Sequence, residues 1–172
     1  PLYFVMEYVT GDSLATLVQR LKSLTIEQSA QLTFDICNTF TKAIAQSVQH
    51  RDLKPENVII RSLDPPDAVI VDYGLSFNHT ADEDVTRATE TLDNRFLSLP
   101  ERRVPGGDRR DARSDLVGIC AILFFCLMGE APVDLVDAKG LPPHRRPGRA
   151  IREKFRGDLR VSQLEAFFDR GF

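Results

Sequence analysis

Two short apolar runs with a turn between them give the clearest pattern in the sequence. Residues 58–60 and 68–71 are compact and rich in β-branched side chains, which is typical of strands. The Asp-Pro-Pro-Asp stretch at 64–67 predicts a turn between them. In an antiparallel hairpin, the residue before the first strand and the residue after the second lie at the same open end. The pattern therefore predicts that Asn57 and Asp72 converge.

Helical spacing predicts two helices before this hairpin. Asp12 or Ser13 can cap the first helix, whose apolar face comprises Leu14, Leu17, Val18 and Leu21. Thr25 with Gln28 is a capping-box signal for the second, longer helix. Its apolar residues recur every four positions, at Leu32, Ile36, Phe40, Ile44 and Val48. We expect this stripe to face the core and the helix to deliver the chain directly to His50.

A third helix is predicted over the apolar segment 116–128. Ser114 and Asp115 open it, and Gly129 ends it as a C-terminal cap. The segment is shorter than the roughly 20 residues that a membrane-spanning helix needs. Because it is apolar on nearly every face, we expect protein to surround it.

Both ends of the chain give weaker signals. Residues 2–6 form an apolar run that predicts a strand. Ser162 with Glu165 is a further capping box, before a helix with an apolar face of Leu164, Phe167 and Phe168. The Pro- and Arg-rich segment 139–160 suits a docking or nucleic-acid surface, but it lacks interleaved aromatic residues, which favours a solvated basic loop.

Composition narrows the class of protein. A chain of 172 residues with 42% hydrophobic and 27% charged residues is typical of one globular domain. A formal net charge of −3 gives no reason to expect a nucleic-acid partner. Three cysteines without paired metal-ligand spacing indicate buried, reduced thiols.

The residues with chemical potential gather at 50–57, which reads His-Arg-Asp-Leu-Lys-Pro-Glu-Asn. This stretch offers a carboxylate at Asp52, an amine at Lys54 and a carboxamide at Asn57. Oxygen ligands from Asn57 and Asp72 suit Mg²⁺, which takes few protein ligands and completes its octahedron with water and phosphates. The alternative is an ordinary turn with solvated charges.

This stretch resembles the catalytic loop of eukaryotic-type protein kinases, H-R-D-L-x-x-x-N, and Asp72-Tyr73-Gly74 resembles their D-F-G metal loop with Tyr in place of Phe. The resemblance implies that Asp52 is the catalytic base and that Lys54 stabilises the transferring phosphoryl group. It also implies that Asn57 and Asp72 hold Mg²⁺, with Mn²⁺ as an alternative ion. Lys54 is typical of the Ser/Thr branch.

The same resemblance implies a domain layout. Residues 1–11 correspond to the last strand and hinge of the N-lobe, where Met6 is the gatekeeper and the backbones of Glu7 and Val9 contact the adenine of ATP. Residues 12–172 correspond to an α+β C-lobe that is mainly helical, with a small hairpin at the catalytic cleft. Because Pro1 stands where an initiator Met would, we expect a fragment, cut at both ends and inactive alone.

The segment between Asp72 and Glu101 resembles an activation loop that ends in Leu-Pro-Glu. Arg51 is then the residue that pairs with an anionic group on this loop. Glu90 occupies the usual phosphorylation position, with Thr89 and Thr91 as alternative phosphosites. Asn94 stands where the family usually has a Thr that bridges the catalytic Asp and Lys.

Four further residues take structural roles by this resemblance. His50 is a packed ring beneath the metal loop, next to Tyr73. Asp115 fixes the catalytic-loop backbone by hydrogen bonds. Glu101 closes the activation loop, although its usual arginine partner would follow residue 172.

The expected function is transfer of the γ-phosphoryl group of ATP to Ser or Thr hydroxyls of a protein substrate. We expect a cytoplasmic kinase domain with no membrane segment in this part, although the parent protein could be anchored elsewhere. One alternative is a pseudokinase or scaffold, favoured by Asn94 and by Cys120. Another is a small-molecule kinase of related fold, which would lack Arg51, the Lys-Pro-Glu stretch and the Pro-Glu closure.

Overall fold

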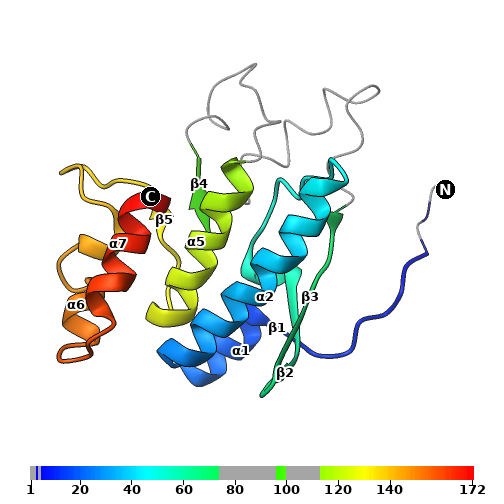
Figure 1. The fold of residues 1–172 in the computed structure, drawn as a ribbon, viewed down its shortest axis with the longest axis horizontal. Helices are drawn as coiled ribbons and strands as arrows, with labels where there is room; N and C mark the ends of the chain where they lie inside the picture. Colours follow the sequence, from blue (N-terminus) through cyan, green and yellow to red (C-terminus); the bar gives the residue numbers. More distant parts are fainter. Residues whose placement is uncertain (1–2, 4, 74–95, 100–112) are drawn as a thin grey trace.

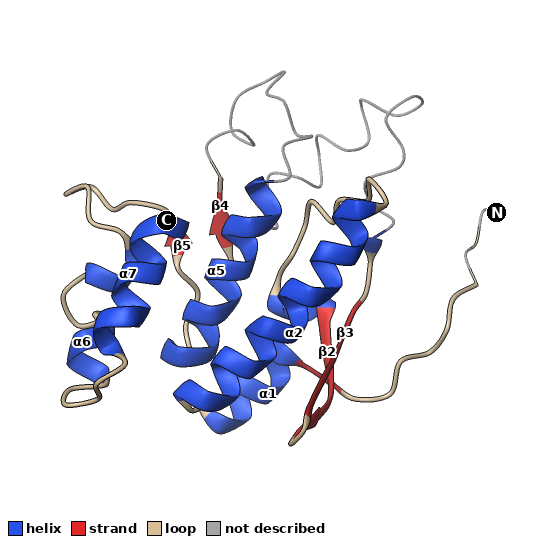
Figure 2. Cartoon of the chain, viewed as in Figure 1, coloured by secondary structure: helices blue, strands red, loops and turns tan. Residues whose placement is uncertain are grey.

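The computed structural model describes residues 3, 5–73, 96–99 and 113–172. Within these residues the chain is mainly helical, with two small sheets (Figure 1, Figure 2). The helices are α1 (Leu14–Leu21), α2 (Ile26–Ala45), α5 (Arg113–Met128), α6 (Ile151–Lys154) and α7 (Val161–Gly171), with 3₁₀ turns η1 (Pro55–Asn57) and η3 (Pro143–Arg145). The strands are β1 (Asp12–Ser13), β2 (Val58–Leu63), β3 (Pro66–Ile70), β4 (Leu97–Ser98) and β5 (Val133–Asp134). The predicted α+β class is confirmed.

The predicted hairpin is present. β2 and β3 pair antiparallel, with Val58 opposite Ile70 and Ile59 opposite Val69. The short strand β1, which the sequence did not predict, pairs with the other edge of β2. Alternate residues of β2 point into the core, where Val58 and Ile60 are buried. The residues that precede β2 and follow β3 therefore lie at one end of the sheet.

The capping residues of α1 and α2 are confirmed. The Ser13 hydroxyl accepts a hydrogen bond from the Thr16 backbone N–H (3.2 Å). Thr25 and Gln28 form both bonds of the capping box, at 3.2 Å and 3.1 Å. These bonds satisfy backbone donors that the first turn of each helix leaves unpaired. The starts of both helices are thus encoded locally.

The ends of the two helices depart from the prediction. Leu21, at the end of α1, is 47% exposed, and Ile44, near the end of α2, is 41% exposed. α2 ends at Ala45, because Ser47 adopts a left-handed conformation (φ +59°) and the Val48 N–H turns back to the Ala43 carbonyl (2.9 Å). The predicted continuous helix up to His50 is therefore wrong, and a turn delivers the chain to the loop.

α5 is the central helix of the molecule. Figure 1 shows it between α2 on one side and α7 on the other. Ten of its residues are buried, as its apolar sequence predicts, although Leu116 is 51% exposed. Among the described residues, no helix is both long enough and apolar enough to cross a membrane. Gly129 ends α5 with φ +79°, and its N–H donates to the Phe125 carbonyl (2.8 Å).

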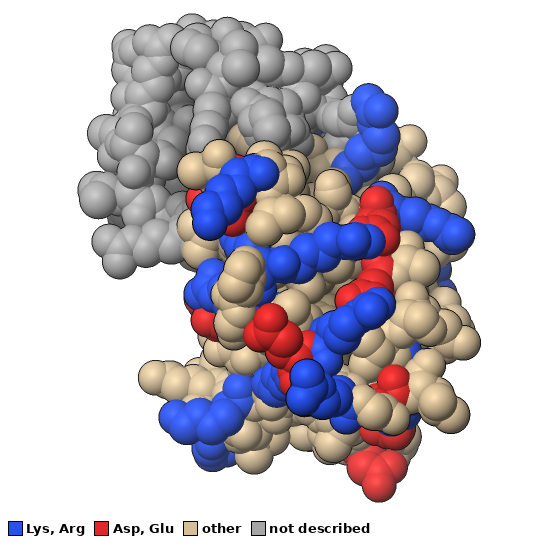
Figure 3. Space-filling view, turned by 90° about the vertical axis from the view of Figure 1, so that its left-hand side faces the viewer, with Lys and Arg blue, Asp and Glu red and all other residues tan. Residues whose placement is uncertain are grey.

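The C-terminal segment is more ordered than predicted. His144, within the expected solvated loop, is fully buried, and Arg145, Arg149 and Arg152 form ion pairs with Asp or Glu residues. Figure 3 shows basic and acidic side chains next to one another on this side of the molecule. The prediction failed because the partners lie far along the chain: Arg149 pairs with Glu130, and Arg145 with Asp169. The basic composition is therefore largely balanced by acidic side chains.

The predicted capping box of α7 is wrong. The helix begins at Val161, its N-cap residue Arg160 makes no side-chain capping bond, and Glu165 pairs with Arg152. The Asp158 carboxylate, which accepts from the Arg160 backbone N–H (2.9 Å), orders the entry to the helix. Of the predicted apolar face, Phe168 is fully buried and Leu164 is half-buried, whereas Phe167 is 41% exposed.

The predicted N-terminal strand is also wrong for the residues that the structure describes there. Tyr3, Val5 and Met6 belong to no strand and are 82%, 89% and 70% exposed. Figure 1 shows this segment running away from the body of the molecule. A strand needs a neighbour to satisfy its backbone donors and acceptors, and no described strand lies beside this one.

Candidate active site

A buried carboxylate fixes the start of the loop 50–57. Asp115, at the start of α5, is 3% exposed and accepts hydrogen bonds from the backbone N–H groups of His50 (2.9 Å) and Arg51 (2.8 Å). A buried charge is costly unless such bonds compensate it. Arg51 adopts a left-handed backbone (φ +66°), so the two N–H groups point at one side chain. Asp115 thus fixes the start of the loop to the central helix.

His50 links the loop to the hairpin. Its ring is 2% exposed, and Nε2 lies 2.9 Å from the Val71 carbonyl oxygen, while Nδ1 accepts from the Asp52 N–H (3.3 Å). These two contacts fit a neutral ring that carries its proton on Nε2. The ring centroid lies 4.8 Å from that of Tyr73. Burial raises the pKa of Tyr73, and the negative charge of Asp115 adds to the effect.

The polar side chains of the loop are fixed to one another. Lys54 Nζ lies 3.1 Å from Asp52 Oδ2. Asn57 is 5% exposed, and its Nδ2 donates to the Asp52 carbonyl oxygen (3.0 Å), which directs Oδ1 away from that carbonyl. Leu53, between Asp52 and Lys54 in the sequence, is buried. A Cβ added at Gly118 of α5 would lie 3.3 Å from the Leu53 Cβ. The loop therefore rests closely on α5.

The hairpin brings Asp72 to this loop. The Val71 N–H donates to the Asn57 carbonyl oxygen (2.9 Å). Asp72 is thus the residue that directly follows the one bonded to Asn57. Asp72 is exposed and has a left-handed backbone (φ +63°). The predicted convergence of the two hairpin ends is confirmed at the level of the main chain.

The donor set fits a hard divalent cation. Asn57 Oδ1 and the Asp72 carboxylate supply oxygen ligands of the kind that Mg²⁺ prefers. Within the described part of the chain, no group of three or more His, Cys, Asp or Glu residues could hold a metal. An ion at Asn57 and Asp72 would therefore depend on water and phosphate for its remaining ligands, which suits Mg²⁺.

Three predicted adenine-contacting residues lie apart from this group. Met6 is exposed, Glu7 forms an ion pair with Arg61 of β2 (3.7 Å), and Val9 is half-buried. The ion pair of Glu7 therefore leads to β2 rather than to the loop 50–57. Their assignment rests on the resemblance alone.

The regulatory residues are only partly described. Arg51 is half-buried in the loop. Glu90, Thr89, Thr91, Asn94 and Glu101 lie outside the described residues.

Sequence reasoning missed contacts that are made through the main chain. The Val71 carbonyl, which binds His50, leaves no trace in a residue pattern, because any residue supplies a carbonyl. Arg146 was placed in a solvated loop, yet its guanidinium is half-buried against backbone carbonyls. A half-buried basic group near proline residues carries no periodic signal that would have identified it.

Comparisons with known proteins identify the family. The sequence model of the protein kinase domain matches residues 1–146. The serine/threonine-protein kinase PknD of Mycobacterium tuberculosis is 29% identical over 184 aligned residues, which cover 98% of this chain and 27% of that protein. PknB of Mycobacterium leprae is 29% identical over 131 residues, covering 76% of this chain and 20% of PknB. The chain thus spans about a quarter or less of the length of these relatives.

Solved structures show the same fold. Rad53 1–466 in complex with AMP-PNP superposes with a TM-score of 0.65 at 20% identity, covering 96% of this chain and 40% of that one. The structure of the Rad53 kinase domain with SCD2, in complex with AMPPNP, superposes with a TM-score of 0.60 at 20% identity. The matched region covers 96% of this chain and 59% of that one. With the family match over residues 1–146, the chain belongs to the protein kinase domain family.

Proposed function

We propose that the protein carrying this chain transfers the γ-phosphoryl group of ATP to Ser or Thr hydroxyls of proteins. The observation that carries the proposal is the joint placement of Asp52, Lys54 and Asn57 on one loop, with the Asp72 segment hydrogen-bonded to Asn57. Relatives that align with the chain are serine/threonine-protein kinases. Lys54 two residues after Asp52 supports the same acceptor class.

Each polar residue has a role in this reaction. Asp52 accepts the proton of the acceptor hydroxyl and orients its oxygen. Lys54 places positive charge beside the transferring phosphoryl group. Asn57, through its bond to the Asp52 carbonyl, keeps the loop in shape, and its Oδ1 would be the atom that binds a cation. Because phosphoryl transfer needs little covalent help from the protein, positioning and charge account for most of the catalysis.

ATP and a divalent cation complete the site. Asn57 and Asp72 would hold Mg²⁺, or Mn²⁺ as an alternative, and the bound ion supplies charge neutralisation at the phosphates. Solved relatives of the same fold hold an ATP analogue. Met6 is the proposed gatekeeper, and the backbones of Glu7 and Val9 are the proposed adenine contacts. An ATP-dependent reaction of this kind suits a cytoplasmic domain.

Regulation is proposed to act through Arg51. Its guanidinium pairs with Glu90, which partly replaces a phosphate, and Thr89 and Thr91 are the alternative phosphosites. Replacement of Glu90 by Ala in the complete protein should then lower activity.

The central test removes the two carboxylates of the site. In the complete protein, with ATP, Mg²⁺ and a generic basic protein as acceptor, Asp52→Asn and Asp72→Ala should each lower turnover by about 100-fold or more, because each group acts on the reacting atoms or their counterion. Asp67→Asn is the matched control, since Asp67 is an exposed carboxylate on β3. Retention of half of the activity by Asp72→Ala would refute the assignment, and a wild type without transfer would favour a scaffold.

A further inference from the structure

A short parallel sheet shares an apolar cluster with the proposed catalytic loop. β4 pairs with β5, with Leu97 opposite Val133 and Ser98 opposite Asp134, and the Val133 N–H donates to the Phe96 carbonyl (3.0 Å). Leu97 and Leu99 are 4% and 3% exposed and belong to the same apolar cluster as Leu53. Because Leu53 lies between Asp52 and Lys54, β4 and the catalytic loop are anchored in the same apolar cluster.

The strand that supports β4 contains a strained residue. Val133 has φ +66°, a left-handed conformation that is unusual for any residue with a side chain and rare for a β-branched one. Such a conformation persists only where surrounding contacts impose it. The contacts that hold Val133 therefore decide where β4 can pair.

Arg146 supplies these contacts. Its Nη1 donates to the Pro132 carbonyl (2.9 Å) and its Nη2 to the Asp134 carbonyl (2.6 Å), so the guanidinium binds the carbonyls on both sides of Val133. Its Nε donates to the Leu141 carbonyl (3.2 Å). The rigid fork of arginine donors suits this arrangement, and a lysine could not reproduce all three bonds in one plane.

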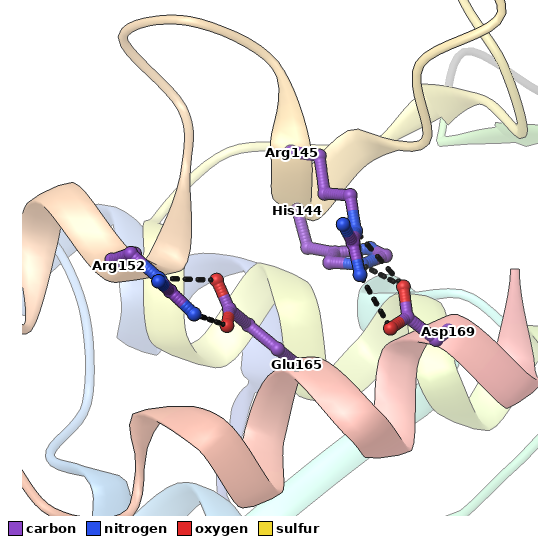
Figure 4. Close-up of polar contacts among 5 residues, drawn as sticks. All are labelled: His144, Arg145, Arg152, Glu165 and Asp169. Carbon is purple, nitrogen blue, oxygen red and sulfur yellow. Dashed lines mark hydrogen bonds and ion pairs between the residues drawn. The ribbon is translucent and has the colours of Figure 1, made fainter.

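The residues before Arg146 anchor it to α7. His144 Nε2 lies 2.9 Å from Asp169 Oδ1, and Arg145 Nη2 lies 2.6 Å from Asp169 Oδ2 (Figure 4). His144 also stacks on Phe168, with ring centroids 5.6 Å apart. Arg146 thus extends from a turn that is fixed to α7 and holds β5 in place from that anchor.

We propose that Arg146 is a positioning residue for the protein acceptor: it holds Val133 strained so that β5 fixes β4 beside the catalytic loop. The inference rests on the proposed function. An acceptor hydroxyl must lie within reach of Asp52, and the acceptor chain needs a fixed surface next to that loop. β4 shares an apolar cluster with Leu53 and contributes no residue to the proposed cation site. Loosening β4 therefore weakens acceptor binding and leaves ATP binding unchanged.

The test uses the complete protein with Arg146→Ala, and myelin basic protein as the acceptor probe. We expect the acceptor KM to rise about tenfold, in line with the sensitivity of catalysis to small displacements, while the ATP KM stays within about twofold of wild type. Hydrogen exchange should accelerate in peptides that cover 96–99 and 131–136, because the Val133 N–H loses its fixed partner. For Arg146→Lys, which keeps the charge, we expect an acceptor KM and an exchange rate between those of wild type and those of Arg146→Ala.

Matched controls separate this role from general destabilisation. Arg152→Ala removes a neighbouring arginine whose ion pair is with Glu165 of α7 rather than with β5, and should leave both KM values unchanged. Should Arg146→Ala fail to fold, Arg146→Lys provides the test, since lysine keeps the charge but cannot make all three bonds to the carbonyls of Pro132, Asp134 and Leu141. It should raise the acceptor KM without lowering the melting temperature by more than a few degrees.

Three results would overturn the proposal. One is unchanged exchange in 96–99 and 131–136 with Arg146→Ala, and another is an equal rise of both KM values. The third is a wild-type protein without kinase activity, which would remove the proposed function and the acceptor role with it. In that last case faster exchange would still show that Arg146 holds β5, so the two failures are distinguishable.

Discussion

At the scale of single residues, the backbone decides which side chains several positions accept. Gly129 ends α5 with φ +79°, and a Cβ added there would lie 1.9 Å from the Lys22 carbonyl oxygen. Gly140 has a similar φ of +76°, but nothing lies within 4 Å of its added Cβ. The two glycines therefore separate the cost of a left-handed conformation from the cost of a steric clash.

We expect Gly140→Ala to lower the free energy of unfolding by about 1–2 kcal/mol, the cost of placing a Cβ in the left-handed region. Gly129→Ala should cost about 3 kcal/mol or more, because the chain must also move the α1–α2 connection away from the new methyl group. Urea denaturation of both variants measures the difference. Equal losses would show that the contact between Gly129 and Lys22 is not tight.

Distance along the sequence explains how much of the site could be predicted. Asn57 and Asp72 could be placed together because the hairpin that joins them is local in sequence, with strands and turn encoded by neighbouring residues. Arg146 could not, because its partners are backbone carbonyls, which every residue has. Side chains that act through the main chain of a distant segment leave no sequence signal.

At the scale of elements, the sequence predicted best the features that depend on neighbouring residues. The caps of α1 and α2 depend on residues three positions apart, and both were correct. The predicted capping box at Ser162 failed because Glu165 pairs with Arg152, which lies outside the helix. The N-terminal strand failed because strand formation depends on a neighbour rather than on composition. Local patterns therefore hold until a long-range partner competes.

The attachment of α7 depends on a buried histidine. The His144 side chain is fully buried, and Nδ1 has no hydrogen-bond partner among the described residues. Burial lowers the pKa of His144 despite the opposing effects of Asp169 and Glu165, and Arg145 lowers it further. The folded state thus favours the neutral ring. Arg145, with His144, holds the pKa of Asp169 below its usual range, so this carboxylate stays charged near neutral pH.

This arrangement predicts a pH dependence of stability. Since the folded pKa of His144 lies below the unfolded value of about 6.5, the unfolded chain binds the proton first as pH falls. The contribution of His144 is therefore full above about pH 6.5 and is lost as pH falls below it. We expect the melting temperature to fall less between pH 7.5 and 5.5 in His144→Leu than in wild type. Parallel pH profiles would contradict this account.

At the scale of the whole molecule, α5 joins two apolar clusters. The first combines residues of α1, α2, the hairpin and β4 with Ile119 and Ile122 of α5. The second comprises Ile26, Leu123, Phe124, Leu127, Ile151, Val161 and Phe168. One helix thus contributes to both clusters, and α7 packs on it so closely that a Cβ added at Gly171 would lie 2.3 Å from Cys120 Sγ. We expect the two clusters to unfold together.

The cysteines can test this cooperativity. Burial raises the pKa of Cys120 to about 11 and that of Cys126 to about 12, whereas Cys37 is only half-buried. Because the thiolate is the nucleophile, iodoacetamide at pH 8 should modify Cys37 first and leave the other two unmodified in the folded protein. In a urea series read by peptide mass spectrometry, Cys120 and Cys126 should become reactive over the same range of concentration.

The position of each thiol gives the result its meaning. Cys120 faces α7 and is exposed as soon as that helix detaches, whereas Cys126 lies in the first cluster and is exposed only when the core opens. The variant Cys37→Ser removes the fast reaction, so that the two transitions can be compared directly. Reaction of Cys120 at clearly lower urea than Cys126 would show that α7 detaches from an intact core, and α5 would then join two units that unfold in sequence.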